Sequence, residues 1–239
     1  MAGTNRMSIE ELKFFLSTEQ ACSYLSDIQS TSVFADPDAK MTTETYSLLI
    51  NHGFRRSANY VYRPHCTSCT SCKPARIPVK LFKPNRNQKR VWKRNSNITI
   101  SATPAEFNES HFQLYQKYIA QRHTGGEMDH ADRTRYIEFL NSDWCDTVFY
   151  ELKLDEQLVA VAVTDNLTEG LSALYTFFDP DLAAKSLGTL SILWQIEKAK
   201  EMNKPWVYLG YWIEACEKMS YKKNFSPLEI WEDESWHAI

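Results

Sequence analysis

Hydrophobic and polar residues alternate in three runs of the C-terminal half, at 147–153, 158–165 and 171–178. A period of two predicts strands with one buried face, and short polar segments between such runs are typical of tight turns. The three runs therefore predict an antiparallel meander.

A helical period follows at residues 186–202. Its apolar positions fall on one face of an amphipathic helix: Leu190, Leu193, Trp194 and Ile196. Short apolar runs at 207–209 and 228–231 then predict two more strands. Because a helix between two strands favours a parallel crossover, the predicted fold class is α+β.

Four more helices are predicted before the meander. Residues 42–52 form one that Gly53 closes, and residues 86–94 form a strongly basic one. Asn108 is the predicted N-cap of the third, and residues 133–140 form the fourth.

The first hundred residues surround a cysteine-rich loop at 65–72. Residues 76–82 alternate like a strand, and Pro78 favours an edge position because proline lacks the amide donor. Residues 8–11 resemble a capping box, which marks the start of a helix. The alternative is a strand at residues 12–16.

Charge divides the chain more sharply than its net value of −3 indicates. Residues 45–105 contain twelve Lys or Arg and no Asp or Glu, whereas the rest holds 15 basic and 30 acidic residues. Such a block favours an anionic partner such as nucleic acid, with a solvated basic face as the alternative. We predict a Cys-rich, basic N-terminal module at residues 1–100, followed by a second domain at residues 101–239.

Composition favours a folded, cytoplasmic protein without a membrane partner. Hydrophobic residues make up 43% of the chain and aromatic residues 13%. The longest apolar stretch, at 158–163, is too short to cross a bilayer. The first fifteen residues contain no apolar run of signal-peptide length.

Three of the six cysteines, Cys66, Cys69 and Cys72, are separated by two residues each. In a chain without an export signal, this spacing favours a metal or redox site over disulfides. Cys22 or His65 is the candidate fourth ligand, and the spacing fits zinc or an iron–sulfur cluster equally well. The alternative is a loop of reduced cysteines.

Gly188 stands at the start of the helix predicted at 186–202. A glycine there lets a phosphate or carbonyl approach the free N–H groups at the positive end of the helix. Acyl-CoA acetyltransferases of the GNAT fold carry a related loop, which Lys185 and Gly188 match but Leu190 does not. A CoA-dependent acetyltransferase is therefore one alternative.

A set of motifs along nearly the whole chain resembles the aminoacyl-tRNA–protein transferases, a family with arginyl and leucyl branches. The motifs are Cys22-Ser-Tyr-Leu25, Gly53-Phe-Arg-Arg-Ser57, Tyr62-Arg-Pro-His-Cys-x-x-Cys-x-x-Cys-x-Pro-x-Arg-Ile-Pro78, Asn87-Gln-Lys-Arg90, Arg94-Asn95, Tyr175-x-Phe-Phe-Asp-Pro180, Ser186-Leu-Gly-Thr189, Tyr208-Leu-Gly-Tyr211 and Met219-x-Tyr-Lys-x-x-Phe-x-Pro227. Ala58 departs from the expected glycine. The short length and the single cysteine cluster resemble the bacterial leucyl branch.

The resemblance implies a GNAT-like transferase core in the second half of the chain and no use of CoA. The implied reaction moves leucine from leucyl-tRNA to the N-terminal α-amine of proteins beginning with Asp or Glu, which creates a degradation signal. Two alternatives stay open: an arginyl donor, and a metal-binding, nucleic-acid-binding regulator without catalysis.

The resemblance and the chemistry of the residues together give candidate site residues. Arg76, Tyr175 and Lys222 would bind the acceptor, with the Arg76 guanidinium gripping its carboxylate. Asp179, Tyr208 and Tyr211 are the candidate catalytic residues. The remaining candidates are Lys185, Gly188 and Thr189 for the donor 3′ end, Arg86, Lys89, Arg90, Lys93 and Arg94 for tRNA phosphates, and Cys22, Cys66, Cys69 and Cys72 for a metal. The alternative for the tyrosines and charged residues is an ordinary place in the core or on the surface.

Overall fold

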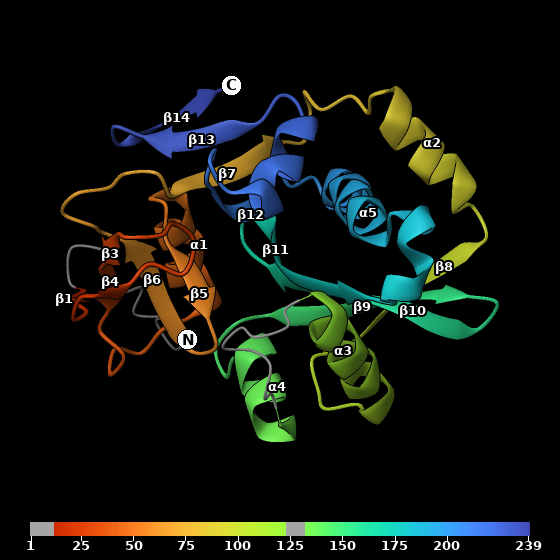
Figure 1. The fold of residues 1–239 in the computed structure, drawn as a ribbon, viewed down its shortest axis with the longest axis horizontal. Coiled ribbons are helices and arrows are strands. Elements are labelled where there is room, and N and C mark those ends of the chain that lie inside the picture. Colours follow the sequence, from red (N-terminus) through yellow and green to blue (C-terminus); the bar gives the residue numbers. More distant parts are fainter. Residues whose placement is uncertain (1–11, 123–131) are drawn as a thin grey trace, which may run out of the picture.

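An eight-stranded mixed sheet takes strands from both halves of the sequence (Figure 1). The computed structural model describes residues 12–122 and 132–239. In spatial order the strands of this sheet are β14 (Ser235–Ala238), β13 (Glu229–Glu232), β7 (Lys73–Pro78), β12 (Trp206–Trp212), β11 (Gly170–Phe178), β10 (Gln157–Asn166), β9 (Thr147–Leu154) and β8 (Ile98–Pro104).

The predicted meander and the predicted crossover are both confirmed. Strands β9, β10 and β11 pair antiparallel in sequence order. Helix α5 (Leu187–Glu201) then returns the chain so that β12 pairs parallel to β11. The α+β class follows, although the GNAT-like assignment and the separate Cys-rich module stay predictions.

Strand β7 lies in the interior of the sheet, so the prediction that Pro78 marks an edge strand is wrong. The strand also begins and ends earlier than the predicted 76–82. It pairs with β12 along its whole length but with β13 only at Ala75 and Arg76. Because pairing with β13 stops before Pro78, the missing proline N–H removes no hydrogen bond on that side.

Strand β7 comes from before residue 100, and β8 spans that position. The large sheet thus joins segments from both sides of the predicted division into residues 1–100 and 101–239. The division itself stays a prediction.

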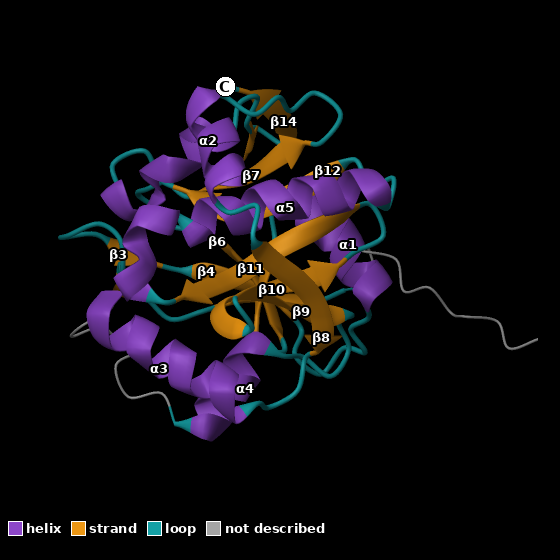
Figure 2. Cartoon of the chain, turned by 90° about the vertical axis from the view of Figure 1, so that its right-hand side faces the viewer, coloured by secondary structure: helices purple, strands orange, loops and turns teal. Residues whose placement is uncertain are grey.

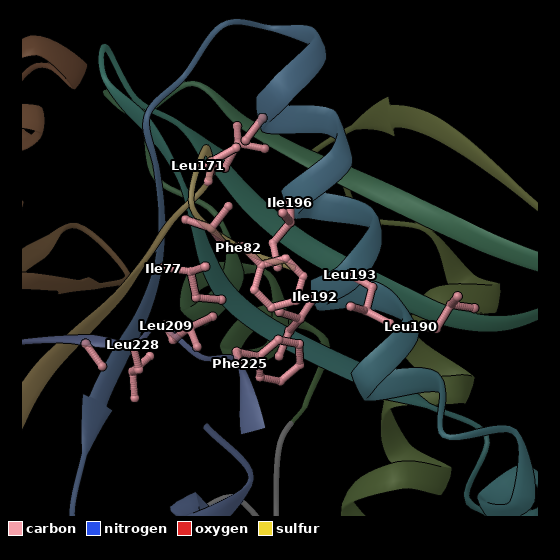
Figure 3. Close-up of a cluster of buried hydrophobic side chains, with 14 of the residues drawn as sticks. Ile77, Phe82, Leu171, Leu190, Ile192, Leu193, Ile196, Leu209, Phe225 and Leu228 are labelled. Carbon is pink, nitrogen blue, oxygen red and sulfur yellow. The ribbon is translucent and has the colours of Figure 1, made fainter. Parts of the chain in front are cut away.

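Helices cover both faces of the sheet, as Figures 1 and 2 show. Helix α5 packs on one face, while α3 (Glu109–Arg122) and α4 (Arg133–Leu140) pack on the other. Side chains of β10 point to both faces of the sheet, so this strand contributes to both cores. Ala160 packs in the core beneath α5, and Val161 and Val163 pack in the core beneath α3 and α4. Figure 3 shows the apolar stripe of α5 against residues of β7, β11 and β12.

The N-terminal segment forms a smaller sheet beside the large one. Its strands are β1 (Phe14–Leu16), β4 (Ser32–Ala35), β6 (Tyr60–Pro64) and β5 (Arg55–Ser57), and a separate pair is formed by β2 (Gln20–Ala21) and β3 (Gln29–Ser30). Strand β1 confirms the strand alternative for residues 12–16, while residues 8–11 lie outside the described part. The hydrophobic core beside the small sheet also includes Leu167 and Tyr208 from the large-sheet half, so the two parts share buried surface.

The helices predicted at 42–52 and 86–94 are confirmed, and the structure adds their N-caps. Thr42 caps α1 (Thr43–Asn51), and its side chain accepts a hydrogen bond from Thr45 N. Asn85 and Gln88 form a capping box at the start of α2 (Arg86–Arg94). Two 3₁₀ segments complete the described elements: η2 (Pro180–Lys185) and η3 (Glu217–Asn224).

Candidate active site

Strands β11 and β12 diverge toward their C-terminal ends. They pair only at Gly170–Ser172 and Trp206–Tyr208, although β11 continues to Phe178 and β12 to Trp212. Register shifts between Val163 and Thr164 and between Tyr208 and Gly210 lie where the pairing ends. The divergence leaves a wedge between two adjacent parallel strands, where backbone groups need other partners.

Arg55 of β5 fills part of this wedge. Its Nη2 donates to the Leu174 carbonyl oxygen of β11 at 3.0 Å. On the other side the guanidinium lies against Gly210 of β12, where a Cβ would stand only 2.8 Å from Nη1. Gly210 also has φ +72°, which a side chain disfavours, so its backbone conformation favours glycine there.

Lys222 of η3 is buried beside the same wedge and is 5% exposed. Its Nζ donates to the Tyr211 carbonyl oxygen. Burial, and then the positive charge of Arg55, lower the pKa of Lys222 to about 7. A fraction of this lysine is therefore neutral at neutral pH.

Tyrosines surround the two cations. Tyr211 is buried, and its hydroxyl donates to the carbonyl oxygen of Tyr62 at 3.1 Å. The Tyr175 hydroxyl is buried without a hydrogen-bond partner in the described part. Burial raises the pKa of Tyr175, while Arg55 acts in the opposite direction. The structure thus brings together three predicted residues: Tyr175, Tyr211 and Lys222.

Arg76 and Tyr208 belong to a different network. Arg76 Nε lies 2.7 Å from Glu229 Oε2, and its guanidinium stands 3.5 Å and 4.1 Å from the ring centroids of Trp206 and Trp236. Arg76 and the Tyr208 hydroxyl both donate to Asn51 Oδ1. The role of Arg76 in gripping an acceptor carboxylate stays a prediction, and it would require displacement of Glu229.

The residues predicted for the donor end lie around the start of α5. Asp179, at the end of β11, accepts a hydrogen bond from Lys117 Nζ at 2.6 Å. A Cβ at Gly188 would meet only the Phe178 ring, at 3.4 Å, so packing does not demand glycine there. Thr189 follows in the first turn, and the Lys185 carbonyl accepts from Asn95.

The basic surface is concentrated on α2. All five predicted tRNA-binding side chains are exposed, and none forms an ion pair with an acid of residues 12–122 or 132–239: Arg86, Lys89, Arg90, Lys93 and Arg94. By contrast, Arg56, Lys73 and Arg76 of the same acid-free segment pair with acids from beyond it. Fewer unpaired basic side chains are therefore available to an anionic partner than the acid-free segment of the sequence indicates.

The predicted metal ligands do not form a ligand set as they stand. No group of three or more metal-binding side chains converges in the described part of the chain. Cys66 Sγ donates to the Thr31 carbonyl and Cys69 Sγ to Ser71 Oγ, as thiols do. Burial first, then the nearby Cys22, Cys66, Cys69 and Cys216, raise the pKa of Cys72 to about 12. The metal site stays a prediction, and no chemical step is assigned to it.

Two residues of the wedge were not among the predicted site residues. Arg55 stands inside the motif Gly53-Phe-Arg-Arg-Ser57, but sequence alone does not separate it from its neighbour Arg56. Gly210 stands in Tyr208-Leu-Gly-Tyr211. A glycine between two strand residues was the available signal, because it marks close approach by another group.

Family models match most of the chain. The C-terminal model of arginine-tRNA-protein transferase covers residues 110–232, and its N-terminal model covers residues 20–90. The chain belongs to the arginine-tRNA-protein transferase family, and it is an aminoacyltransferase. The resemblance inferred from the motifs is confirmed, whereas a regulator without catalysis is not supported.

Several similar proteins are named leucyltransferases. An aspartate/glutamate leucyltransferase of Nitrosococcus oceani is 50% identical over 95% of both chains. Those of Alcanivorax borkumensis and Pseudomonas syringae pv. tomato are each 46% identical, over 95% and 97% of this chain and 94% and 98% of theirs. A solved structure of L-PGS from Bacillus licheniformis matches with 12% identity and a TM-score of 0.48, over 72% of this chain and 51% of that chain.

None of the helices in the described residues has the length and apolar character needed to cross a membrane.

Proposed function

We propose that this chain transfers leucine from leucyl-tRNA to the N-terminal α-amine of cytoplasmic proteins that begin with Asp or Glu. The new N-terminal leucine then marks those proteins for degradation. The observation that carries the proposal is identity of 46–50% to aspartate/glutamate leucyltransferases along at least 95% of this chain.

The reaction needs positioning more than activation. The α-amine attacks the ester carbonyl of the aminoacyl-tRNA, a C–N bond forms, and the ester C–O bond to the tRNA ribose breaks. The amine loses a proton and the ribose oxygen gains one. Because an α-amine has a pKa of about 8, a useful fraction of the amine is already neutral and nucleophilic at neutral pH. Orientation and stabilisation of the oxyanion remain for the protein.

The wedge between β11 and β12 is the proposed place for this step. Tyr211 and Lys222 reach it: Lys222 Nζ donates to the Tyr211 carbonyl oxygen, and this buried ammonium suits an anionic group of the acceptor. Tyr175, whose ring packs against Tyr118 and Phe139 on the α3–α4 side, has a buried hydroxyl without a hydrogen-bond partner in the described part. Asp179 accepts a hydrogen bond from Lys117, and the Tyr208 hydroxyl donates to Asn51. In this proposal Asp179 and Tyr208 therefore influence the reaction through Lys117 and Asn51.

The donor is proposed to lie along α2 and the start of α5. Exposed cations on α2 suit the phosphates of tRNA. Arg94 Nη2 approaches Ser186 Oγ, the N-cap of α5, at 3.4 Å. The exposed cations of α2 therefore lie next to Lys185, Gly188 and Thr189. There the free N–H groups of α5 would receive the aminoacylated 3′ end.

Four cysteines are proposed, separately, as a zinc or iron–sulfur site: Cys22, Cys66, Cys69 and Cys72. Their support is the two-residue spacing and the mutual proximity that raises the pKa of Cys72. Elemental analysis of protein purified without oxygen tests this, with Cys66→Ser as the comparison. Metal-free protein with full activity would contradict it.

Acceptor selection tests the proposed function. The protein is incubated with labelled leucyl-tRNA and peptides that differ only in the first residue: Asp, Glu, Asn or Ala. We expect label on the Asp and Glu peptides. Equal labelling of all four, or of none, would contradict the proposal.

A further inference from the structure

Of three arginines in β5 and β7, Arg56 and Arg76 are buried and Arg55 is half-buried, and in the described part of the chain Arg55 alone lacks a carboxylate partner. Arg56 pairs with Asp165, and Arg76 pairs with Glu229. The hydrogen bond that the structure gives the Arg55 side chain goes to the Leu174 carbonyl oxygen. Arginine cannot lose its proton in a protein, so Arg55 keeps a charge that its surroundings leave uncompensated.

A second unpaired cation lies beside it. Lys222 is almost fully buried, and its ammonium donates to a backbone oxygen of Tyr211, while no acid of the described part approaches it. Two enclosed cations that interact with each other are costly unless an anion joins them. The small cavity beside Arg55 is otherwise lined by uncharged residues, among them Phe54, Tyr208 and Tyr211, and by no carboxylate of the described part.

The missing anion fits the acceptor of the proposed reaction. We propose that Arg55, assisted by Lys222, binds the side-chain carboxylate of the first residue of the acceptor protein. This inference rests on the proposed function and names the residue that selects its substrate.

The geometry of Arg55 suits a planar carboxylate. The Leu174 carbonyl oxygen holds Nη2, and the guanidinium occupies the space that a side chain at position 210 would fill. The other N–H groups are left for two parallel hydrogen bonds to a carboxylate. Lys222, on a flexible stem, can approach the carboxylate of either Asp or Glu, which differ by one methylene.

This site differs from the tRNA surface in its exposure, although the start of α2 contacts η3, where Asn85 and Gln88 both donate to the Asn224 carbonyl oxygen. Figure 1 shows α2 on the far side of α5 from β5. The exposed cations of α2 lie open to a large polyanion, whereas Arg55 lies between Leu174 of β11 and Gly210 of β12, and Lys222 is buried against the Tyr211 carbonyl oxygen. A side-chain carboxylate therefore fits Arg55 better than a tRNA phosphate does.

The test compares Arg55→Gln with Arg63→Gln in the full chain. Arg63, on the neighbouring strand β6, also donates to a backbone carbonyl, that of His52. Initial rates of leucine transfer are measured with Asp- and Asn-starting peptides, and leucyl-tRNA affinity by filter binding. We expect Arg55→Gln to reduce the Asp-to-Asn ratio of kcat/KM by about 30-fold or more. Leucyl-tRNA affinity should stay within about twofold, and Arg63→Gln should leave both quantities unchanged.

An unchanged Asp-to-Asn ratio would overturn the inference, whether kcat/KM stays the same or falls equally for both peptides and whether or not tRNA affinity is lost. If Arg55→Gln does not fold, Arg55→Lys replaces it. Lysine keeps the charge but cannot make two parallel bonds, so the ratio should fall at least about tenfold, and an unchanged ratio overturns the inference. Failure of the wild-type protein to transfer leucine to any peptide would instead overturn the proposed function.

Discussion

Arg56 of β5 and Asp165 of β10 form a fully buried ion pair that joins the small sheet to the large one. Arg56 Nε donates to Asp165 Oδ2 at 2.9 Å, and Nη2 donates to Oδ1 at 2.5 Å. Thr147 Oγ1 also donates to Asp165 Oδ1, at 2.8 Å. Because the pair is hydrogen-bonded on all sides, removal of one member leaves the other charged and buried.

Asp165→Asn should therefore be strongly destabilising. We expect the free energy of unfolding in urea to fall by about 3–5 kcal/mol, because Arg56 then loses its counter-charge. Glu201→Gln is the control, since the exposed pair of Glu201 with Lys198 on α5 should contribute less than about 1 kcal/mol. Equal losses in the two variants would contradict this role for the buried pair.

The basic face of α2 should govern tRNA affinity. Replacement of Lys89 and Lys93 by Glu should weaken leucyl-tRNA binding and flatten its dependence on salt, since each phosphate contact adds about 0.7–0.9 to the salt slope. Lys13→Glu with Lys40→Glu, two exposed changes in the N-terminal segment with the same net charge, is the control. Equal affinities and slopes for the two double variants would place the tRNA surface elsewhere.

Burial of Lys222 should make stability depend on pH. Its pKa is about 7 in the folded protein, below the usual value of 10.5. Above 10.5 the lysine is neutral in both states. As the pH falls from 10.5 to 7, the unfolded chain takes up the proton first, so the folded state loses stability, and below 7 the loss stays constant.

Lys222→Met should abolish this pH-dependent loss of folding stability, because methionine has no titratable group. The gain in unfolding free energy of Lys222→Met over wild type should be larger at pH 6 than at pH 9, by roughly 2 kcal/mol. Urea unfolding at the two pH values measures the difference. A gain that is independent of pH would show that Lys222 is not buried as a cation.

Arg76 should act on stability more than on specificity. Because Glu229 and two tryptophans already hold its guanidinium, Arg76→Gln should lower the unfolding free energy by about 2–4 kcal/mol. The Asp-to-Asn ratio of kcat/KM should then stay within a few fold of wild type. Loss of that ratio in Arg76→Gln, with Arg55→Gln unaffected, would restore the prediction made from the sequence.

Local patterns in the sequence predict elements well where one face alone is buried. The period of two in the meander and the apolar stripe of α5 each reflect a single buried face, and the structure confirms both. Strand β7 was misplaced because its position depends on β12 and β13, which come more than a hundred residues later. Short strands such as β5 and β6 are also set by pairing across the small sheet.

The candidate site shows the same limit. Arg55 and Arg56 are adjacent and chemically identical, and only the fold gives Arg56 the Asp165 carboxylate and Arg55 the Leu174 carbonyl oxygen. Lys222 was predicted from a family motif, but its burial beside Arg55 depends on packing between η3 and β12. Residues brought together across such distances have no common signal in the sequence.

Leucine transfer itself is tested most directly by mass spectrometry of one Asp-starting peptide. The peptide is incubated with the protein and, in separate reactions, with leucyl-tRNA, arginyl-tRNA or acetyl-CoA. We predict a product that carries one leucyl residue on its α-amine in the leucyl-tRNA reaction, and unmodified peptide in the other two. An arginylated or acetylated peptide, or an unmodified peptide in all three reactions, would contradict the proposed function.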